Sequence, residues 1–195
     1  MRKPKYPLIL LVIVSAGLAL LSATQTWFTF TIASGAGGSA ELVVNGSVAA
    51  PALSALSFAA IALAAALAIA GPVIRLVLGV LGVVLGGSVI LSAAIAIGDP
   101  ALSGASAVTK ATGVSGAESV RGLVSSVTWT AWPVLALVAG ILLVLAAIAV
   151  LVTSRMWPAS ARRYQAVRLE GAETSAKDRA VDEWDELSRG DDPTA

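Results

Sequence analysis

Residues 130–153 read TAWPVLALVAGILLVLAAIAVLVT and contain no charged side chain. A helix needs about 20 apolar residues to cross the hydrocarbon core of a bilayer. This stretch is long enough and apolar enough to do so. It therefore predicts a membrane-spanning helix, and the rest of the chain is interpreted around it.

Three earlier stretches have the same character: 8–25, 50–70 and 73–97. Their only charged residue is Arg75, which follows the Gly71-Pro72 break closely enough for its long side chain to reach the membrane interface. The sequence predicts an all-α membrane protein, a bundle of four transmembrane helices. The remaining segments are the two ends and two loops: 1–7, 26–49, 98–129 and 154–195.

The composition argues against a soluble protein and against most site chemistry. Of the 195 residues, 57% are hydrophobic and 13% are charged, whereas soluble domains are about a quarter charged. The chain has no cysteine and no histidine, which removes thiolate ligands and the usual general base near neutral pH. No ionisable group lies near the middle of any predicted span. We expect no catalytic, cofactor-binding or metal-binding residues and no enzyme activity.

A signal peptide is the alternative interpretation of the first span. A basic start, an apolar run and small residues near Ser22 and Ala23 fit that description. The run is long for a signal peptide, however, and Leu21 stands where cleavage after Ala23 would favour a small residue. These features favour an uncleaved membrane helix.

The distribution of basic residues predicts the orientation. Positive charge gathers on the cytoplasmic side of membrane proteins. An inner N-terminus places eight basic residues inside: Arg2, Lys3, Lys5, Arg75, Arg155, Arg162, Arg163 and Arg168. It leaves only Lys110 and Arg121 outside. The sequence thus predicts a multi-pass plasma-membrane protein with both termini in the cytoplasm.

The loop at 26–49 has strand character. Phe28, Phe30 and Ile32 alternate with threonines, which is the period-two pattern of a half-buried strand. Residues 34–38 then resemble a turn, and residues 41–45 the returning strand. A small extracellular β-hairpin is predicted here, with a flexible linker as the alternative. In the second outer loop, residues 118–124 could form a short helix.

Glycines in the third span indicate close helix packing. Gly82 and Gly86 have the four-residue spacing that lets helix backbones approach each other in lipid, and Gly79 and Gly87 extend the set. Packing within the bundle is the simpler interpretation. Self-association into a homo-oligomer through this face is the alternative.

Tryptophans occur at the predicted helix ends: Trp27, Trp129, Trp132 and Trp157. Trp favours the headgroup region, so membrane anchoring is the first interpretation. The alternative is a candidate outer rim, in which Trp27, Trp129 and Trp132 share one outward-facing site.

The segment after the last span divides in two. Its first part has four arginines and no acids, which suits contact with anionic membrane lipid: Arg155, Arg162, Arg163 and Arg168. The acidic second part places Val181, Trp184 and Leu187 on one face of a short helix. This pattern predicts a segment that binds a cytoplasmic protein partner, with a solvated tail as the alternative. The candidate interaction residues are Trp184, Leu187, Ser188, Arg189 and Gly190.

Five short pieces form a pattern that is specific in its order and its position relative to the spans. They are Ser22–Trp27, Gly46–Leu53, Trp132–Pro133, Arg155–Pro158 with Arg163–Tyr164, and Trp184–Thr194. In these pieces the chain resembles the tryptophan-biosynthesis-associated membrane protein family of actinobacteria. The resemblance implies a link to tryptophan metabolism through an activity that is not established, and it implies no catalytic residues.

Two functions follow as expectations. The first is a non-enzymatic membrane accessory protein that recruits a cytoplasmic partner through its tail. The second is a small oligomeric transporter or permease component for tryptophan or a related aromatic metabolite. Neither involves nucleic acid or a cofactor.

Overall fold

A computed structural model describes residues 5–33 and 38–154 of the chain. Its four long helices are α1 (Lys5–Thr24), α3 (Ala52–Ile69), α4 (Pro72–Gly98) and α8 (Trp132–Thr153). All four are long and apolar enough to cross a membrane. The predicted four-helix transmembrane bundle is confirmed.

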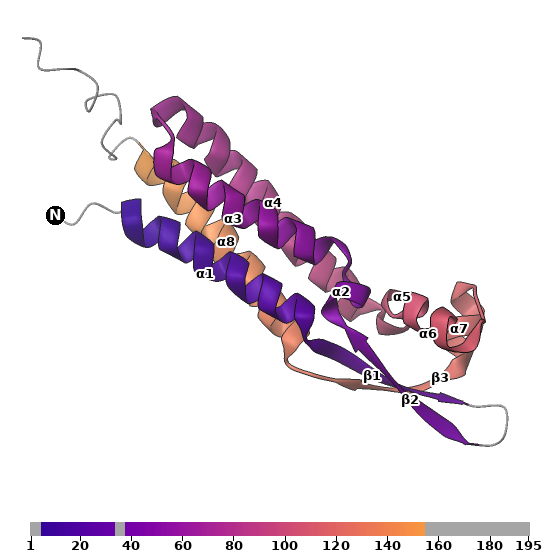
Figure 1. Ribbon diagram of the computed structural model, residues 1–195. Coiled ribbons are helices and arrows are strands. Elements are labelled where there is room, and N and C mark those ends of the chain that lie inside the picture. Colours follow the sequence, from indigo (N-terminus) through magenta and orange to yellow (C-terminus); the bar gives the residue numbers. More distant parts are fainter. Residues whose placement is uncertain (1–4, 34–37, 155–195) are drawn as a thin grey trace, which may run out of the picture. The chain divides into compact units, whose positions relative to one another are not determined.

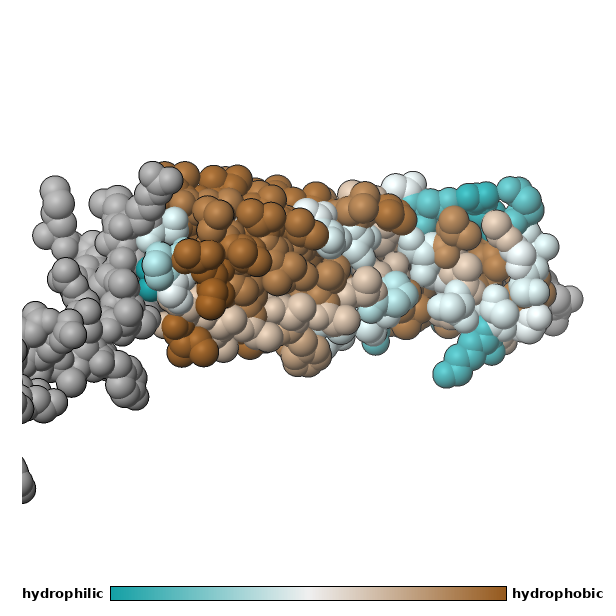
Figure 2. Space-filling view, turned by 90° about the horizontal axis from the view of Figure 1, so that it is seen from above, coloured by the Kyte–Doolittle hydropathy of each residue, from teal (hydrophilic) through white to brown (hydrophobic). Residues whose placement is uncertain are grey.

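The four helices form a ring in the order α1–α3–α4–α8, and each helix contacts its two neighbours (Figure 1). Gly71 and Pro72 separate α3 from α4, with Pro72 in the first turn of α4, where its missing N–H breaks no helical hydrogen bond. The connection is so short that α3 and α4 run antiparallel. The surface of the bundle is mostly hydrophobic on the face seen in Figure 2, as contact with lipid requires.

A seam of small residues joins α4 to α8. The buried residues of α4 recur every three or four positions: Arg75, Gly79, Gly82, Gly86, Val89, Ala93 and Ala96. A Cβ added at Gly86 would lie 2.7 Å from Val144 Cγ2 and 2.9 Å from the backbone nitrogen of Val144. Gly87, by contrast, has no such neighbour within 4 Å. The face that carries Gly82 and Gly86 is therefore occupied by α8 of the same chain.

Arg75 corrects one expectation. Its side chain is fully buried, although the sequence suggested that it reaches out to the membrane interface. The reason is its position, because Arg75 lies four residues before Gly79 on the buried seam. Helical periodicity therefore turns Arg75 toward the protein.

A small folded domain, here called the cap, stands at one end of the bundle (Figure 1). It comprises residues 26–33, 38–51 and 98–131. Its strands are β1 (Thr26–Ala33), β2 (Ser39–Asn45) and β3 (Val124–Trp129). Its helices are α2 (Gly46–Ala49), α5 (Pro100–Ser103), α6 (Ala105–Thr112) and α7 (Ala117–Leu123). The cap surface in Figure 2 is mixed, with polar and hydrophobic patches side by side.

The three strands form one antiparallel sheet in the order β2-β1-β3. The predicted hairpin is confirmed as β1 and β2, in which Phe28 pairs with Val44 and Phe30 with Leu42. The predicted turn includes residues 34–37, which lie outside the described residues. The sheet contains one strand more than predicted, because β3 pairs with the other edge of β1.

A bulge explains why β3 escaped detection. Thr31 pairs with Ser126, but Ile32 pairs with Val124, so one residue of β3 is extra. The bulge brings Val124 and Val127 to the same side of the sheet, although three positions separate them. The period-two signal that identifies strands is therefore absent from this segment.

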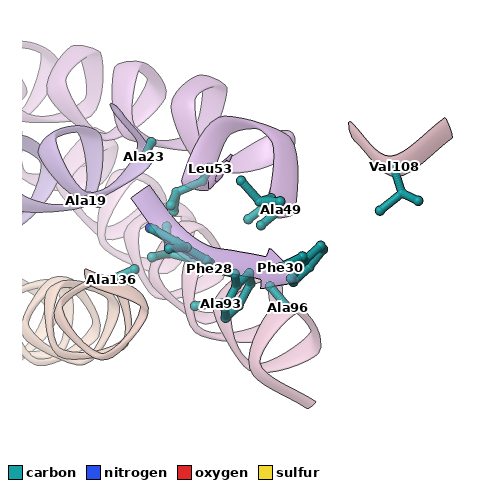
Figure 3. Close-up of a cluster of buried hydrophobic side chains, with 14 of the residues drawn as sticks. Ala19, Ala23, Phe28, Phe30, Ala49, Leu53, Ala93, Ala96, Val108 and Ala136 are labelled. Carbon is teal, nitrogen blue, oxygen red and sulfur yellow. The ribbon is translucent and has the colours of Figure 1, made fainter. Parts of the chain in front are cut away.

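One hydrophobic core joins the cap to the bundle. Phe28 and Phe30 are fully buried and belong to the same cluster as Ala93 and Ala96 of α4. Figure 3 shows both rings beside these alanines, with Val108 of α6 at the cap side of the cluster. The cap is thus packed onto the helix ends, and its position is set by shared burial of apolar surface.

Candidate functional site: the cap and its junction with the bundle

Trp27 lies at the centre of the junction between α1 and the cap. Its side chain is fully buried, and Nε1 donates hydrogen bonds to the carbonyl oxygen of Ser22 at 2.8 Å and to Ser22 Oγ at 3.1 Å. Gly46 lies against the indole, where a Cβ would come 2.5 Å from Nε1. The indole of Trp27 is therefore bonded to the C-terminal end of α1. Because its side chain is fully buried, it does not act as an interfacial anchor, contrary to the first interpretation of this residue.

Hydrogen bonds tie two further chain segments to the same place. Ser22 Oγ donates to the carbonyl oxygen of Trp132 at 2.6 Å. Thr130 Oγ1 donates to the carbonyl oxygen of Thr26 at 2.7 Å, and Gly46 N donates to that of Gln25 at 2.9 Å. Three pieces of the sequence pattern, which begin at Ser22, Gly46 and Trp132, thus meet at one point. We call residues 22–27, 46 and 130–132 the junction.

Two tryptophan rings, one from the junction and one from the residue just before its last segment, pack against Phe28. The rings of Trp27 and Trp129 both meet that of Phe28 edge to face, with centroid separations of 6.2 Å and 5.1 Å. Trp129 is 47% exposed, and Trp132 is partly buried against the core. The structure therefore gathers Trp27, Trp129 and Trp132 in one region, but only Trp129 offers substantial surface there.

An ion-pair cluster links the end of α4 to α7. Arg121 forms a hydrogen-bonded ion pair with Asp99 and a second one, at 3.0 Å, with Glu118. Asp99 Oδ1 also accepts a hydrogen bond from the backbone N–H of Leu102 at 3.0 Å, so it caps α5. The hydrogen bond from Arg121, together with that from Leu102, holds the pKa of Asp99 below its ordinary value. The hydrogen bond to Asp99 raises the pKa of Arg121.

Two adjoining grooves run along the cap. The first has a volume of ≈ 380 Å³, and its lining comes from α2, α4, α5, α6 and residues that flank them: Val48, Ala49, Pro51, Ile95, Asp99, Leu102, Ser103 and Ser106. The second has a volume of ≈ 410 Å³, and its lining comes from β2, α2 and α6: Leu42, Val43, Val48, Ser106, Ala107, Lys110 and Ala111. Val48 and Ser106 belong to both grooves. We call the pair the cap groove.

The sequence did not single out the cap groove, although one local signal was available. Asp99 followed by Pro100 is the pattern of a helix N-cap with proline in the first turn, and α5 begins there. Lys110 is exposed and stands in the last turn of α6. The lining side chains come from segments far apart in the chain, so no local spacing marks them as a set.

Two findings concern metal-binding groups and the serine hydroxyls of the spans. Within residues 5–33 and 38–154, no three His, Cys, Asp or Glu side chains are grouped to hold a metal ion. Three serines of the spans donate to backbone carbonyls one turn earlier in their own helices: Ser15 to Leu11 at 2.7 Å, Ser57 to Leu53 at 2.8 Å and Ser88 to Val84 at 2.9 Å. These hydroxyls are used in local helix structure.

The predicted lipid-contact and interaction residues lie outside the described residues. This set is Arg155, Arg162, Arg163, Arg168, Trp184, Leu187, Ser188, Arg189 and Gly190, and Trp157 lies there too.

Comparison with known proteins supplies the family. No curated protein and no solved structure matches the chain. The sequence model described as "Tryptophan-associated transmembrane protein" matches residues 9–194, which is nearly the whole chain. That span includes the cap, three of the four transmembrane helices in full, and all of α1 except its first four residues. The chain belongs to the tryptophan-associated transmembrane protein family.

Proposed function

We propose that this protein is a non-enzymatic accessory of tryptophan metabolism in the plasma membrane. In this proposal the helix bundle is a scaffold, with both termini in the cytoplasm. The cap and the C-terminal tail carry the recognition, the tail by binding a cytoplasmic protein partner. The observation that carries the proposal is the closed, apolar interior of the bundle.

Small side chains fill that interior. One buried cluster consists of Val12 and Ala16 of α1, Ala60 and Ala64 of α3, and Leu143 and Ala146 of α8. The only charged side chain within the four spans as the structure bounds them, Tyr6–Thr24, Ala52–Ile69, Pro72–Gly98 and Trp132–Thr153, is Arg75, in the first turn of α4. Ion paths and proton relays in membrane proteins use charged or polar side chains inside the bilayer. Among the described residues of the spans, Arg75 lies at a helix end, and the buried hydroxyls of Ser15 and Ser57 bond to carbonyls of their own helices, so they form no continuous polar lining across a single copy.

The cap supports a recognition role outside the bilayer. Its sheet shares one core with the helix ends, so the cap has a defined place on the bundle. A scaffold of this kind presents surfaces in a fixed geometry, as binding sites on rigid elements require.

Partner recovery from intact membranes tests the proposal. Deleting residues 181–195 should abolish co-purification of a crosslinked cytoplasmic partner and leave membrane insertion unchanged. Replacing Trp184 and Leu187 with alanine should have the same effect, because both lie on the apolar face of the expected helix. Glu186→Ala, off that face, is the matched control. Equal partner recovery from the full-length and shortened chains would refute tail-mediated docking.

The alternative is a transporter component built from several copies. An apolar groove of ≈ 350 Å³ between α3 and α4 favours it: Ala59, Ala62, Leu63, Ala66, Leu78, Leu81 and Leu85 line this groove. Small residues let a helix of a second copy approach closely in lipid. Crosslinked oligomers, together with faster tryptophan or indole flux into vesicles that contain the protein, would support this alternative. Equal flux with and without the protein would reject it.

A further inference from the structure

The cap groove has the features of a ligand site. Its two parts, ≈ 380 Å³ and ≈ 410 Å³, each fall within the range of about 300–1,000 Å³ that small-molecule sites occupy. Most of the lining is aliphatic, and the hydroxyls of Ser103 and Ser106 add polar groups. Apolar walls with a few polar groups are typical of sites for small organic molecules.

The charges along the groove indicate the sign of the ligand. Asp99 and Lys110 are the two charged residues of its lining. Asp99 is already held by Arg121 and by the backbone N–H of Leu102. Lys110 forms no ion pair with any residue in the described part of the chain, and its side chain is exposed. The charge left to meet a ligand is therefore positive.

The groove also has a direction. One part contains Ile95, near the end of the transmembrane helix α4, and the other contains Lys110, in the last turn of α6. Ile95 and Leu102 are 61% and 48% exposed, so the first part presents apolar surface. An occupant would place its apolar body over Val48 and its anionic group at Lys110.

We propose that the cap groove binds a small organic carboxylate with an apolar body, whose carboxylate pairs with Lys110 Nζ. This inference goes beyond the proposed function, because it assigns a ligand class to the cap and does not depend on the tail. A zwitterionic α-amino group has no acidic partner at the Lys110 end of the lining, so a simple carboxylate fits better than an amino acid. The two parts share Val48 and Ser106, so one ligand can lie across both.

A binding titration of the full-length protein in lipid nanodiscs tests this assignment. The probes are 3-indolepropionate and its neutral amide, 3-indolepropionamide, which share the same apolar body. Wild type should bind the acid about two- to fivefold more tightly than the amide, as expected for one ion pair with an exposed lysine. Lys110→Gln should remove this preference while retaining weak binding of both probes.

Two further variants test the location. Ser106→Trp, at the position shared by both parts, should abolish binding of both probes, whereas Ser125→Trp, on the exposed bulge of β3, should leave binding unchanged. Ala111→Trp also fills the groove, and it replaces Ser106→Trp in the test if Ser106→Trp lowers the unfolding temperature. Lys5→Gln, at the first residue of α1, controls for the loss of one positive charge outside the groove.

Several results would overturn the proposal. One is the lack of saturable binding of 3-indolepropionate to the wild type. Another is an unchanged preference for the acid in Lys110→Gln, which would leave Lys110 with a purely structural role at the C-terminus of α6. Unchanged binding of both probes in a folded Ser106→Trp or Ala111→Trp variant would show that the ligand binds outside the cap groove.

Discussion

Gly46 lies against the indole of Trp27, so closely that a Cβ at position 46 would come 2.5 Å from Nε1 and 2.8 Å from the carbonyl oxygen of Ser22. The same Nε1 donates its hydrogen bond to that carbonyl at 2.8 Å. A side chain at position 46 would thus disrupt the hydrogen bond from Trp27 Nε1 to the carbonyl oxygen of Ser22 near the end of α1. Trp27 lies in β1 and bonds back to Ser22 of α1, so its contact with Gly46 holds the start of α2 against the end of the first transmembrane helix.

Gly46→Ala should therefore destabilise the junction. Overpacking of this kind costs about 1–3 kcal/mol. We expect a lower unfolding temperature in detergent and a red shift of the tryptophan emission as Trp27 loses its buried position. Gly122→Ala is the matched control, because no heavy atom would meet its Cβ within 4 Å. Equal stability of the two variants would contradict the packing described for Trp27.

Gly86 and Gly87 are neighbours in α4, and alanine substitutions at the two positions test the packing of α4 against α8. Gly86→Ala places a Cβ 2.9 Å from the backbone nitrogen of Val144, so α8 must shift. Gly87→Ala meets nothing within 4 Å and replaces a poor helix former. Thermal unfolding in detergent should show a loss for Gly86→Ala, of about 1–3 kcal/mol, and no loss for Gly87→Ala. A loss of stability in Gly87→Ala but not in Gly86→Ala would contradict the described packing of α4 against α8. It would show that the face of α4 carrying Gly87 is packed instead.

The link between Asp99 and Arg121 should make the cap sensitive to acid. The folded-state pKa of Asp99 is lowered, so its contribution to stability is complete above the unfolded value near 3.8. The contribution is lost as the pH falls through the lower folded value, and Arg121 remains charged throughout. The protection factors of the amides in α5 and α7, which correct for the slower intrinsic exchange in acid, should fall below about pH 4.

Asp99→Ala should show faster exchange at the Leu102 amide even at neutral pH, because it removes the cap of α5. Glu118→Gln is the control, since Glu118 pairs with the same arginine but its side chain is 92% exposed. If Asp99→Ala and Glu118→Gln accelerated exchange at the Leu102 amide to a similar extent, the hydrogen bond from the Leu102 N–H to Asp99 would contribute nothing beyond the charge of Asp99.

The proposed orientation can be tested with single cysteines, because the chain has none of its own. Ser125→Cys lies on the exposed side of the cap, and Gly71→Cys lies in the turn between α3 and α4 at the other end of the bundle. A membrane-impermeant maleimide should label Ser125→Cys in intact cells. It should label Gly71→Cys only after permeabilisation. The reverse labelling pattern would show that the topology is opposite to the proposed one.

The transmembrane architecture and the hairpin could be predicted from the sequence because their signals are local. An apolar stretch such as residues 130–153 needs no partner to be recognised as a span. The alternation of Phe28, Phe30 and Ile32 with threonines likewise reports a half-buried strand directly. Spacing also marked Gly82 and Gly86 as packing residues, although it did not identify α8 as the helix they meet.

The third strand, the burial of Trp27 and Arg75, and the cap groove appear only in the tertiary structure. The bulge in β3 breaks the alternation that would mark it, and its pairing with β1 spans almost a hundred residues. Trp27 has the position of an interfacial anchor until Gly46 makes room for its ring.

By itself, then, the sequence determined how many helices cross the membrane and where the first hairpin forms, because a span requires one long apolar run and a half-buried strand requires alternation between neighbouring residues. The tertiary structure alone decided which faces meet, because contacts such as Ser22 with Trp132 join residues that no local period connects. Close packing selects those contacts by shape, through the space that glycine and alanine leave for a facing side chain.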